Sequence, residues 1–351
     1  MKTAEIMNQI ETEMLDNLLR LVMAGDRAIG SAEWQMNKLQ QLGLLRGENL
    51  KSIGKHRDAL IKSIKEEIEY QAFRKVAMVD EASKAAGVSF AGVMKAGADP
   101  VLRETIAKWE AQTLNELGRV SATLLEGANR IYIDTVTKAA VKVQLGVSGR
   151  TAIADTAKEW AETGIPALVD SANRTWTTEA YAQTIIRSTS TKAANDSQLA
   201  RMEELDEDLV EVSSHMGSRP EHADFQGRIF SISGKSKKYP PLSETGYGTA
   251  GGIGGVNCRH VLYPYFPGTK KTFSPQPEKR NEEAYKNSQK QRYIERSIRS
   301  AKRELSAMER IRDDVAMQEA RAKVRSRQAA MREFIDSTGR ARQYAREQIY
   351  E

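Results

Sequence analysis

The sequence lacks most features of secreted, disulfide-bonded and membrane-spanning proteins. Its 351 residues include one cysteine, Cys258, so no disulfide can form within the chain, and a reducing cytoplasm suits its synthesis. No apolar run approaches the roughly 18 residues that are needed to span a bilayer. Acidic residues at Glu5, Glu11 and Glu13 stand where a signal peptide needs an apolar run. We therefore expect a protein with no membrane span that is not secreted by that route.

Aromatic residues are also scarce, at 6% of the chain, whereas 28% of the residues are charged and 40% are hydrophobic. This composition permits a packed core but predicts a helical protein with much solvated surface. The length exceeds the roughly 100–200 residues that a single core usually takes. We therefore expect two or more structural units.

The net charge of +6 is concentrated at one end of the chain. From Lys279 to Glu351 there are 19 Lys and Arg against 12 Asp and Glu, a net of +7. The residues before Lys279 hold 34 against 35, a net of −1. A cationic helical tail can meet the phosphates of DNA or an acidic protein surface, or it can be an ordinary solvated helix face, and composition does not choose among these.

Apolar residues recur with helical spacing over the first 208 residues. An N-terminal helical region is expected over residues 1–100, with one helix face marked by Ile6, Ile10, Met14 and Leu18. Residues 48–86 contain almost no helix breaker and predict one long helix. A central helical region is expected over residues 101–208, with helices over about 101–146 and 151–205.

The basic tail, residues 279–351, is expected to be helical, with a short coiled-coil seam. Spacings of four and three residues connect the positions of this seam, which Arg312 interrupts: Ile294, Ile298, Ala301, Leu305, Met308 and Val315. A helix this polar is unstable alone. We therefore expect it to dock on the N-terminal helices or to self-associate. Self-association would make the protein a homo-oligomer.

Residues 209–272 differ in character from the rest. The runs LVEVSSH, RIFSI and RHVLYPYF favour strands, and most of the prolines and a cluster of glycines accompany them. The sequence therefore predicts a small α+β module among helices. The expected fold class is mainly α, with long helices, this irregular Gly/Pro-rich module and a basic C-terminal helix.

The module gathers three of the four histidines of the chain with its cysteine. A Cys-x-His spacing on a strand would aim Cys258 and His260 to one face. Together with His215 and His222 they offer four nitrogen and sulfur ligands, which can satisfy tetrahedral zinc, although the spacing is not that of the common zinc ribbons and fingers. The alternative is that the module holds no cofactor and that these imidazoles form a buried hydrogen-bond network with Arg219, Asp224 and Asn257.

Catalytic arrangements of the same residues are weaker alternatives. Cys258 with a histidine and Asn257 has the residue types of a thiol hydrolase, but Asn257 is its direct neighbour in sequence. Arg219, His222 and Asp224 could serve a metal-dependent hydrolase or nuclease, although no spacing demands it. The sequence therefore favours a protein that is not an enzyme.

The glycine-rich segment GYGTAGGIGG contains a G-x-G-x-x-G pattern. It lacks the preceding strand and the following helix that place a pyrophosphate on a helix N-terminus. We expect a tightly turned loop that requires close approach of backbone, and no nucleotide site.

Longer segments resemble a known family. VSSHMGSRPEHADFQGRIFSISG and, after a short loop, TGYGTAGGIGGVNCRHVLYPYFPG closely resemble the phage minor capsid protein 2 family. IIRSTSTKAANDSQLARMEE and the tail segments KNSQKQRYIERSIRSAKRELSAM and RSRQAAMREFI are similar to its flanking helices, so the resemblance covers roughly residues 180–340. More distantly, the order R-P-x-H, Gly, N-C-R-H is similar to head morphogenesis proteins of the Mu protein F and SPP1 protein 7 type. Their pattern ends in N-C-R-C, where this chain has His260.

The resemblance implies a structural minor head protein of a tailed bacteriophage. Such a protein is assembled in the bacterial host cytoplasm and lies in the virion near the portal, with contacts to portal, capsid or scaffold proteins and to packaged DNA. It implies no established catalytic activity. The residues that carry the family pattern are His215, Gly217, Arg219, Pro220, His222, Gln226, Gly227, Asn257, Cys258, Arg259 and His260.

Overall fold

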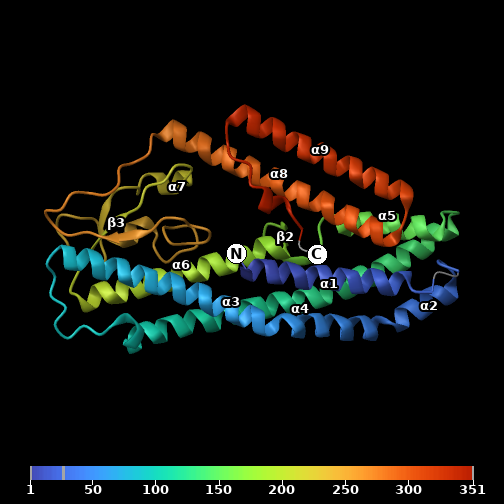
Figure 1. Ribbon diagram of the computed structural model, residues 1–351, viewed down its shortest axis with the longest axis horizontal. Helices are drawn as coiled ribbons and strands as arrows, with labels where there is room; N and C mark the ends of the chain where they lie inside the picture. The colour runs from blue at the N-terminus through green and yellow to red at the C-terminus, as the bar shows by residue number, and fades with distance from the viewer. Residues whose placement is uncertain (1, 26–27, 350–351) are drawn as a thin grey trace. The chain divides into compact units, whose positions relative to one another are not determined.

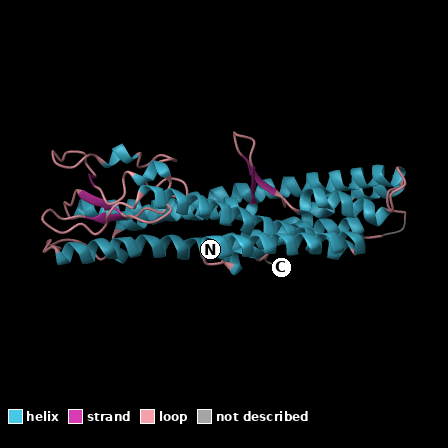
Figure 2. Cartoon of the chain, turned by 90° about the horizontal axis from the view of Figure 1, so that it is seen from above, coloured by secondary structure: helices cyan, strands magenta, loops and turns pink. Residues whose placement is uncertain are grey.

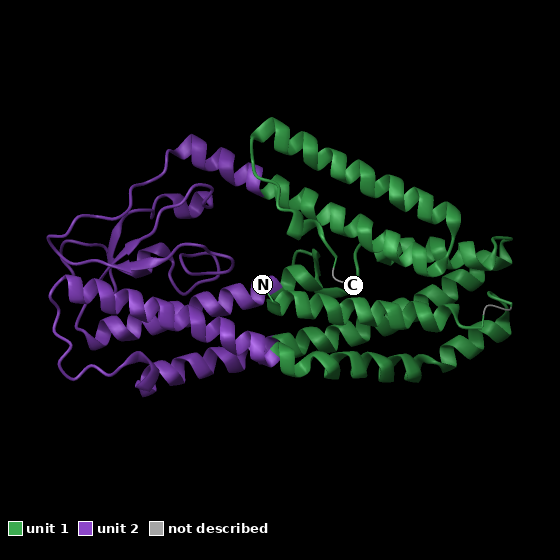
Figure 3. Cartoon of the chain, viewed as in Figure 1, with its two compact units in different colours: residues 1–60, 117–182, 289–351 green, residues 61–116, 183–288 purple. Residues whose placement is uncertain are grey.

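The computed structural model describes residues 2–25 and 28–349, and these are mainly helical (Figure 1). Contacts between residues divide the chain into two compact units (Figure 3). Unit 1 comprises residues 1–60, 117–182 and 289–351, and unit 2 comprises residues 61–116 and 183–288. The expected fold class, mainly α with a small β-containing module, is confirmed. The division into 1–100, 101–208, 209–272 and 279–351 describes the order along the chain and stays a prediction about modules.

Unit 1 contains helices from three separate parts of the chain. These are α1 (Lys2–Met23), α2 (Ala32–Gln40), the first part of α3 (Leu42–Ala85), the second part of α4 (Pro100–Gln144), α5 (Gly149–Ala161), most of α8 (Glu278–Ile311) and α9 (Asp314–Thr338). A short 3-10 helix, η3 (Tyr344–Glu347), follows α9. The expected helices over residues 48–86 and 101–146 correspond to α3 and α4.

The core of unit 1 joins the two ends of the chain. Leu18 and Val22 of α1 are fully buried and belong to the same cluster as Tyr132 of α4 and Met308 and Ile311 of α8. Apolar spacing on α1 and α8 produces this contact, since each helix presents one apolar stripe. The expectation that the basic tail docks on the N-terminal helices is confirmed.

The tail is not one continuous seam. Arg312 has a left-handed backbone conformation, φ 60°, and ends α8, while the Asp313 side chain accepts a hydrogen bond from the Ala316 backbone and begins α9. Ile294 and Ile298 pack with Met331 and Phe334 of α9, so α8 and α9 lie side by side. Val315, expected on the seam, is instead 69% exposed because the chain has already turned.

A β-hairpin lies in the region expected to be one helix over residues 151–205. Strands β1 (Pro166–Val169) and β2 (Thr175–Thr177) pair antiparallel between α5 and α6 (Thr178–Glu204) (Figure 2). The Asp170 side chain accepts hydrogen bonds from two backbone N–H groups of the turn, those of Ala172 and Arg174. This Asx-type turn overrides helix propensity.

The hairpin is anchored to α1 by a buried carboxylate. Glu11 is 1% exposed, and its Oε1 accepts a hydrogen bond from the Ile165 backbone at 2.7 Å. Burial raises the pKa of Glu11 above its ordinary value, and the nearby Arg303 opposes this. The carboxyl group therefore favours its protonated form more strongly in the folded chain than in water.

Unit 2 combines helices with a three-stranded antiparallel sheet of order β4-β3-β5. It holds the rest of α3 and α4, the short η1 (Ala96–Ala98), most of α6, and α7 (Pro220–Ala223) and η2 (Leu242–Thr245). The central strand β3 (Leu209–Val212) pairs with β4 (Ile229–Ser231) and β5 (Leu262–Pro264). The runs LVEVSSH, RIFSI and RHVLYPYF therefore contain the strands that they predict.

The sheet of unit 2 packs on two helices. Val210, Phe230 and Leu262, one from each strand, are fully buried in a cluster with Val79 of α3 and Met202 of α6. The strands are only three or four residues long. Loops and the short α7 therefore make up most of the module and carry the histidines and the cysteine.

Candidate functional site

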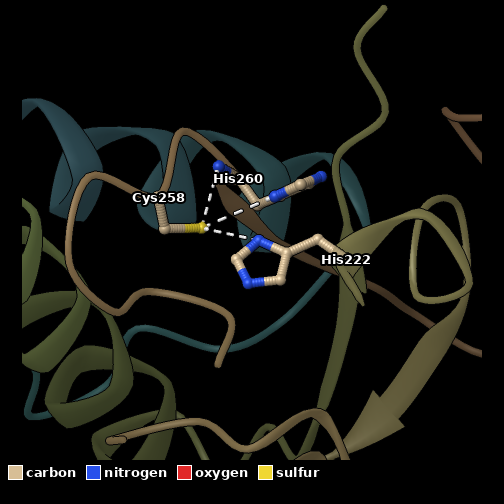
Figure 4. A group of neighbouring side chains, drawn as sticks. All are labelled: His222, Cys258 and His260. Carbon is tan, nitrogen blue, oxygen red and sulfur yellow. Dashed lines mark hydrogen bonds between the residues drawn. The ribbon is translucent and has the colours of Figure 1, made fainter. Parts of the chain in front are cut away.

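Three of the four predicted ligand residues converge inside unit 2. The Sγ atom of Cys258 lies 3.6 Å from Nδ1 of His222 and 3.5 Å from Nδ1 of His260, and the ligand atoms of all three lie within 4.8 Å of one another (Figure 4). His222 and His260 are 2% exposed and Cys258 is 4% exposed. The cluster is thus closed to solvent.

The sequence spacing brings these residues together, but not by the expected geometry. His222 lies on α7, whereas Cys258 and His260 lie in the loop just before β5 and not on a strand. The loop turns at Asn257, whose φ is 56°, and the His260 backbone N–H then donates to Sγ of Cys258 at 3.4 Å. A tight loop, and not strand alternation, therefore places both side chains on one side.

Hydrogen bonds orient the His222 ring. Its Nε2 lies 2.7 Å from the Gly251 carbonyl oxygen. A carbonyl only accepts, so Nε2 carries the proton and Nδ1 faces the sulfur of Cys258. The contact with Cys258 raises the pKa of His222 above its ordinary value, although burial opposes it.

The other two members of the cluster respond to burial in different ways. Burial raises the pKa of Cys258, but the His222 ring and the backbone N–H groups of Gly254 and His260 more than offset this, and the thiol pKa falls below its ordinary value. For His260, burial lowers the pKa to about 3, so its ring is neutral at pH 7. Such a site combines a soft sulfur donor with a neutral imidazole.

His215 is adjacent but outside the closest group. Its ring centroid lies 4.4 Å from that of His260, with the ring planes tilted by 45°, and its backbone N–H donates to Oε1 of Gln226. Burial lowers the pKa of His215, with contributions from the charges of Arg259 and His222. The four predicted ligand residues therefore occupy one neighbourhood, with three in ligand geometry.

The remaining family-pattern residues shape the loops around the cluster. Gln226 is 1% exposed and links the His215 backbone to the Ser218 hydroxyl. Gly227 has φ 64°, and a Cβ there would lie 2.9 Å from the Phe273 carbonyl oxygen. Gly217 also has a positive φ, and Pro220 is the first residue of α7. These positions explain why the pattern contains glycine and proline.

The buried hydrogen-bond network is narrower than the sequence predicts. Arg219 donates to the Val256 carbonyl and so ties the two loops together. Asn257 instead faces α6, where its side chain bonds Arg187 and Thr184. The side chains of Asp224 and Arg259 are exposed and do not belong to the buried cluster.

The glycine-rich loop is part of the site through its backbone. Gly251 supplies the carbonyl that orients His222, and a Cβ on Gly252 would lie 2.0 Å from the Gly246 carbonyl oxygen. Close approach of backbone is therefore the reason for the glycines. No helix follows the loop in the described part of the chain before α8, so a dinucleotide-type phosphate site has no structural basis there.

Sequence reasoning missed two buried polar anchors of the module. Oδ1 of Asn281, on the first turn of α8, accepts hydrogen bonds from the backbones of Gly217 and Ser218 at 2.8 and 3.0 Å. Glu211, on the central strand, is 2% exposed, and its carboxylate accepts from the backbones of Thr272 and Phe273, both at 2.8 Å. A glutamate inside the run LVEV was the available signal.

The comparisons with known proteins extend the resemblance to nearly the whole chain. The sequence matches the phage minor capsid protein 2 family over residues 1–336. A "Structural protein" of Lactococcus phage LL-H is 29% identical over 339 residues, which covers 91% of this chain and 89% of the relative. A "Structural protein" of Lactococcus phage mv4 is 37% identical over 116 residues, covering 32% of this chain and 93% of the relative.

No solved structure matches the chain. Among the helices of the described residues, none is long and apolar enough to cross a membrane. The family match includes the N-terminal helices, the central helices and the His/Cys module together. The chain belongs to the phage minor capsid protein 2 family.

Proposed function

We propose that this protein is a minor structural component of the phage head that acts beside the portal in head assembly or in DNA packaging and delivery. The observation that carries the proposal is the family match over residues 1–336. The relative from phage LL-H, described as a structural protein, supports it over 91% of the chain. In this role the helices of unit 1 would provide surfaces for portal, capsid or scaffold proteins.

The closed His/Cys cluster favours a scaffold over an enzyme. A metal-dependent hydrolase needs an open coordination position or a pocket that admits substrate. Here each of the three converging side chains is at most 4% exposed, and Asp224, one of the candidate nuclease residues, points to solvent. The arrangement suits a module whose loops are held in one conformation.

Cross-linking mass spectrometry on purified virions would test the position beside the portal. The expected result is a low copy number per virion and cross-links to the portal protein. Absence from virions, or cross-links only to tail proteins, would contradict the proposal. Complementation of a deletion phage adds a functional readout: His222→Ala is expected to reduce head yield, whereas Glu221→Ala, its exposed neighbour on α7, is expected to support normal yield.

A DNA-binding role of the tail is a second candidate, and one observation favours it. Arg321, Arg325 and Arg332 are exposed and recur at spacings that place them on one face of α9. This stripe could meet the phosphates of packaged DNA. Arg321 of this stripe also pairs with Glu309 of α8, and Arg310 pairs with Asp16 of α1, so Arg325 and Arg332 are the members of the stripe that the test changes.

Salt-dependent binding to duplex DNA would test this second role. An Arg325→Glu, Arg332→Glu double variant is expected to weaken binding to duplex DNA. The logarithm of the binding constant should also fall less steeply with the logarithm of the salt concentration, by roughly 0.9 in slope for each phosphate that the protein no longer neutralises. The matched control is Arg119→Glu, Arg130→Glu, which makes the same charge change on exposed positions of α4. Equal weakening in both double variants would show a non-specific charge effect and would reject the stripe as the binding surface.

A further inference from the structure

The distances within the His/Cys cluster match those of a metal site. Zinc bonds sulfur at about 2.3 Å and imidazole nitrogen at about 2.0–2.1 Å, so a tetrahedral angle separates S and N by about 3.6 Å. The two observed separations from Sγ of Cys258, to Nδ1 of His222 and to Nδ1 of His260, are 3.6 and 3.5 Å. The ligand atoms of all three residues lie within 4.8 Å of one another, so small side-chain adjustments would let one ion bond to all three.

The hydrogen bonds around His222 and Cys258 also follow the pattern of metal ligands. Imidazole ligands almost always donate their second ring N–H to a carboxylate, a carbonyl or water. His222 does so toward the Gly251 carbonyl, which leaves the Nδ1 lone pair directed at the cluster. The backbone N–H of His260 donates to Sγ of Cys258, a contact that stabilises a thiolate.

The ring of His260 is only partly hydrogen-bonded. Nε2 of His260 is buried and has no hydrogen-bond partner among the described residues. Because no neighbouring group donates a hydrogen bond to Nε2, the neutral ring can carry its proton on that atom. In that tautomer Nδ1, on the side of Cys258, presents its lone pair.

We propose that the module binds one zinc ion through Nδ1 of His222, Sγ of Cys258 and Nδ1 of His260, with His215 as the fourth ligand. His215 is the next imidazole, with its ring against that of His260, and a turn of the side chain would bring a nitrogen to the open position. One thiolate and three imidazoles suit zinc in softness and number. Binding releases the thiol proton of Cys258 to solvent.

The bound ion would act as a staple for a small module. It joins α7 to the loop that precedes β5, and through the Gly251 carbonyl it also fixes the glycine-rich loop. Three strands of three or four residues bury little surface, and small folds of this kind often depend on a metal or disulfides. With one cysteine in the chain, no disulfide is available for this purpose.

Elemental analysis of the full-length protein, purified without chelators, would test the site. One zinc per chain is expected, with loss of the metal in Cys258→Ser and in His222→Asn. His56→Asn is the matched control, because His56 is the histidine outside the module and contacts Glu13 in unit 1. Zinc retained by both site variants, or lost equally in the control, would overturn the assignment.

Cobalt titration of the metal-free wild-type protein provides a readout that does not depend on the folding of variants. The expected result is a thiolate-to-cobalt charge-transfer band and the visible spectrum of a tetrahedral ion at one equivalent. His215→Asn is expected to lose the tetrahedral spectrum while keeping the thiolate band, which isolates the fourth ligand. A wild-type protein that shows neither stoichiometric zinc nor a thiolate–cobalt band would overturn the proposal.

Discussion

Arg201 is a fully buried cation on which three parts of unit 2 converge. Its side chain is 0% exposed, with Nε 3.0 Å from the Asp80 carboxylate of α3 and Nη1 2.5 Å from Glu204 of its own helix, α6. Nη2 donates to the Met94 carbonyl at 2.9 Å, and the Asp99 carboxylate lies 3.8 Å from Nη1. The Nε contact is an ion pair and not a directed hydrogen bond, because the N–H does not point at the oxygen.

The variant Arg201→Met would keep much of the side-chain volume but remove the charge. The Asp80 and Asp99 side chains, 22% and 8% exposed, would then lose their buried counter-ion. Breaking a buried ion pair on one side destabilises a protein by about 3–5 kcal/mol. Since the whole stability of a domain is typically about 5–15 kcal/mol, we expect unit 2 to become marginal at neutral pH.

The destabilisation should depend on pH in a defined direction. Burial raises the pKa of Asp80 above its ordinary value, although the positive charge of Arg201 partly offsets this rise. An acid whose folded pKa lies above its unfolded value contributes stability below the unfolded pKa and loses it as the pH rises through the folded pKa. Removing Arg201 raises the folded pKa further, so the difference between variant and wild type should grow with rising pH and shrink toward about pH 4.

Hydrogen-exchange mass spectrometry on peptides from α6 and β3 would measure the opening free energy of unit 2 directly. Arg119→Met, an exposed position on α4, is the matched control and should change stability by less than about 0.5 kcal/mol. A destabilisation below about 1 kcal/mol in Arg201→Met would refute the view that Asp80 and Asp99 need this cation. A destabilisation that grows as the pH falls would refute the assigned role of Asp80.

Three further predictions concern buried positions. In a thermal unfolding assay, Gly227→Ala is expected to lower the free energy of unfolding by about 1–3 kcal/mol, because Gly227 has a positive φ and its new Cβ would approach the Phe273 carbonyl oxygen. The control Gly47→Ala lies in open space on α3 and should be neutral or stabilising in the same assay. Glu211→Gln should cost about 1–3 kcal/mol in urea titration, because the two backbone N–H groups bond different carboxylate oxygens and an amide replaces one of these oxygens with a donor. An unchanged midpoint would contradict this. The raised pKa of Glu11 implies stability that is present below its ordinary pKa of 4.5 and is lost as the pH rises. Glu11→Gln should flatten this dependence, and a steeper one would contradict the argument.

The long helices and their buried faces could be predicted from the sequence because local spacing determines them. The four residues expected on one face of α1 are all buried: Ile6, Ile10, Met14 and Leu18. The hairpin of β1 and β2 was not predicted because a short Asx turn at Asp170 decides it, and the surrounding residues are compatible with a helix. The break at Arg312 was visible in the sequence, but not the reversal that exposes Val315.

The members of the candidate site could be named from the sequence, whereas their geometry could not. His222, Cys258 and His260 stand out because such residues are rare in this chain. The separation of His215 from the closest group, and the outward direction of Asp224, depend on loop conformations that contacts distant in sequence determine. Asn281 is a second example of a contact that local sequence does not predict, since nothing in its neighbourhood along the chain indicates that its side chain accepts a hydrogen bond from the Gly217 backbone.

The strand order β4-β3-β5 has a consequence for the synthesis of the protein. The central strand cannot gain its second neighbour until Leu262 has left the ribosome, and its buried Glu211 waits for Thr272 and Phe273. Val79, made much earlier, belongs to a core cluster that is complete only when Leu262 joins it. Contacts so distant along the chain slow folding, and they leave apolar helix faces uncovered in the nascent protein. Until Leu262, Thr272 and Phe273 are made, these uncovered faces are the kind of surface that chaperones bind.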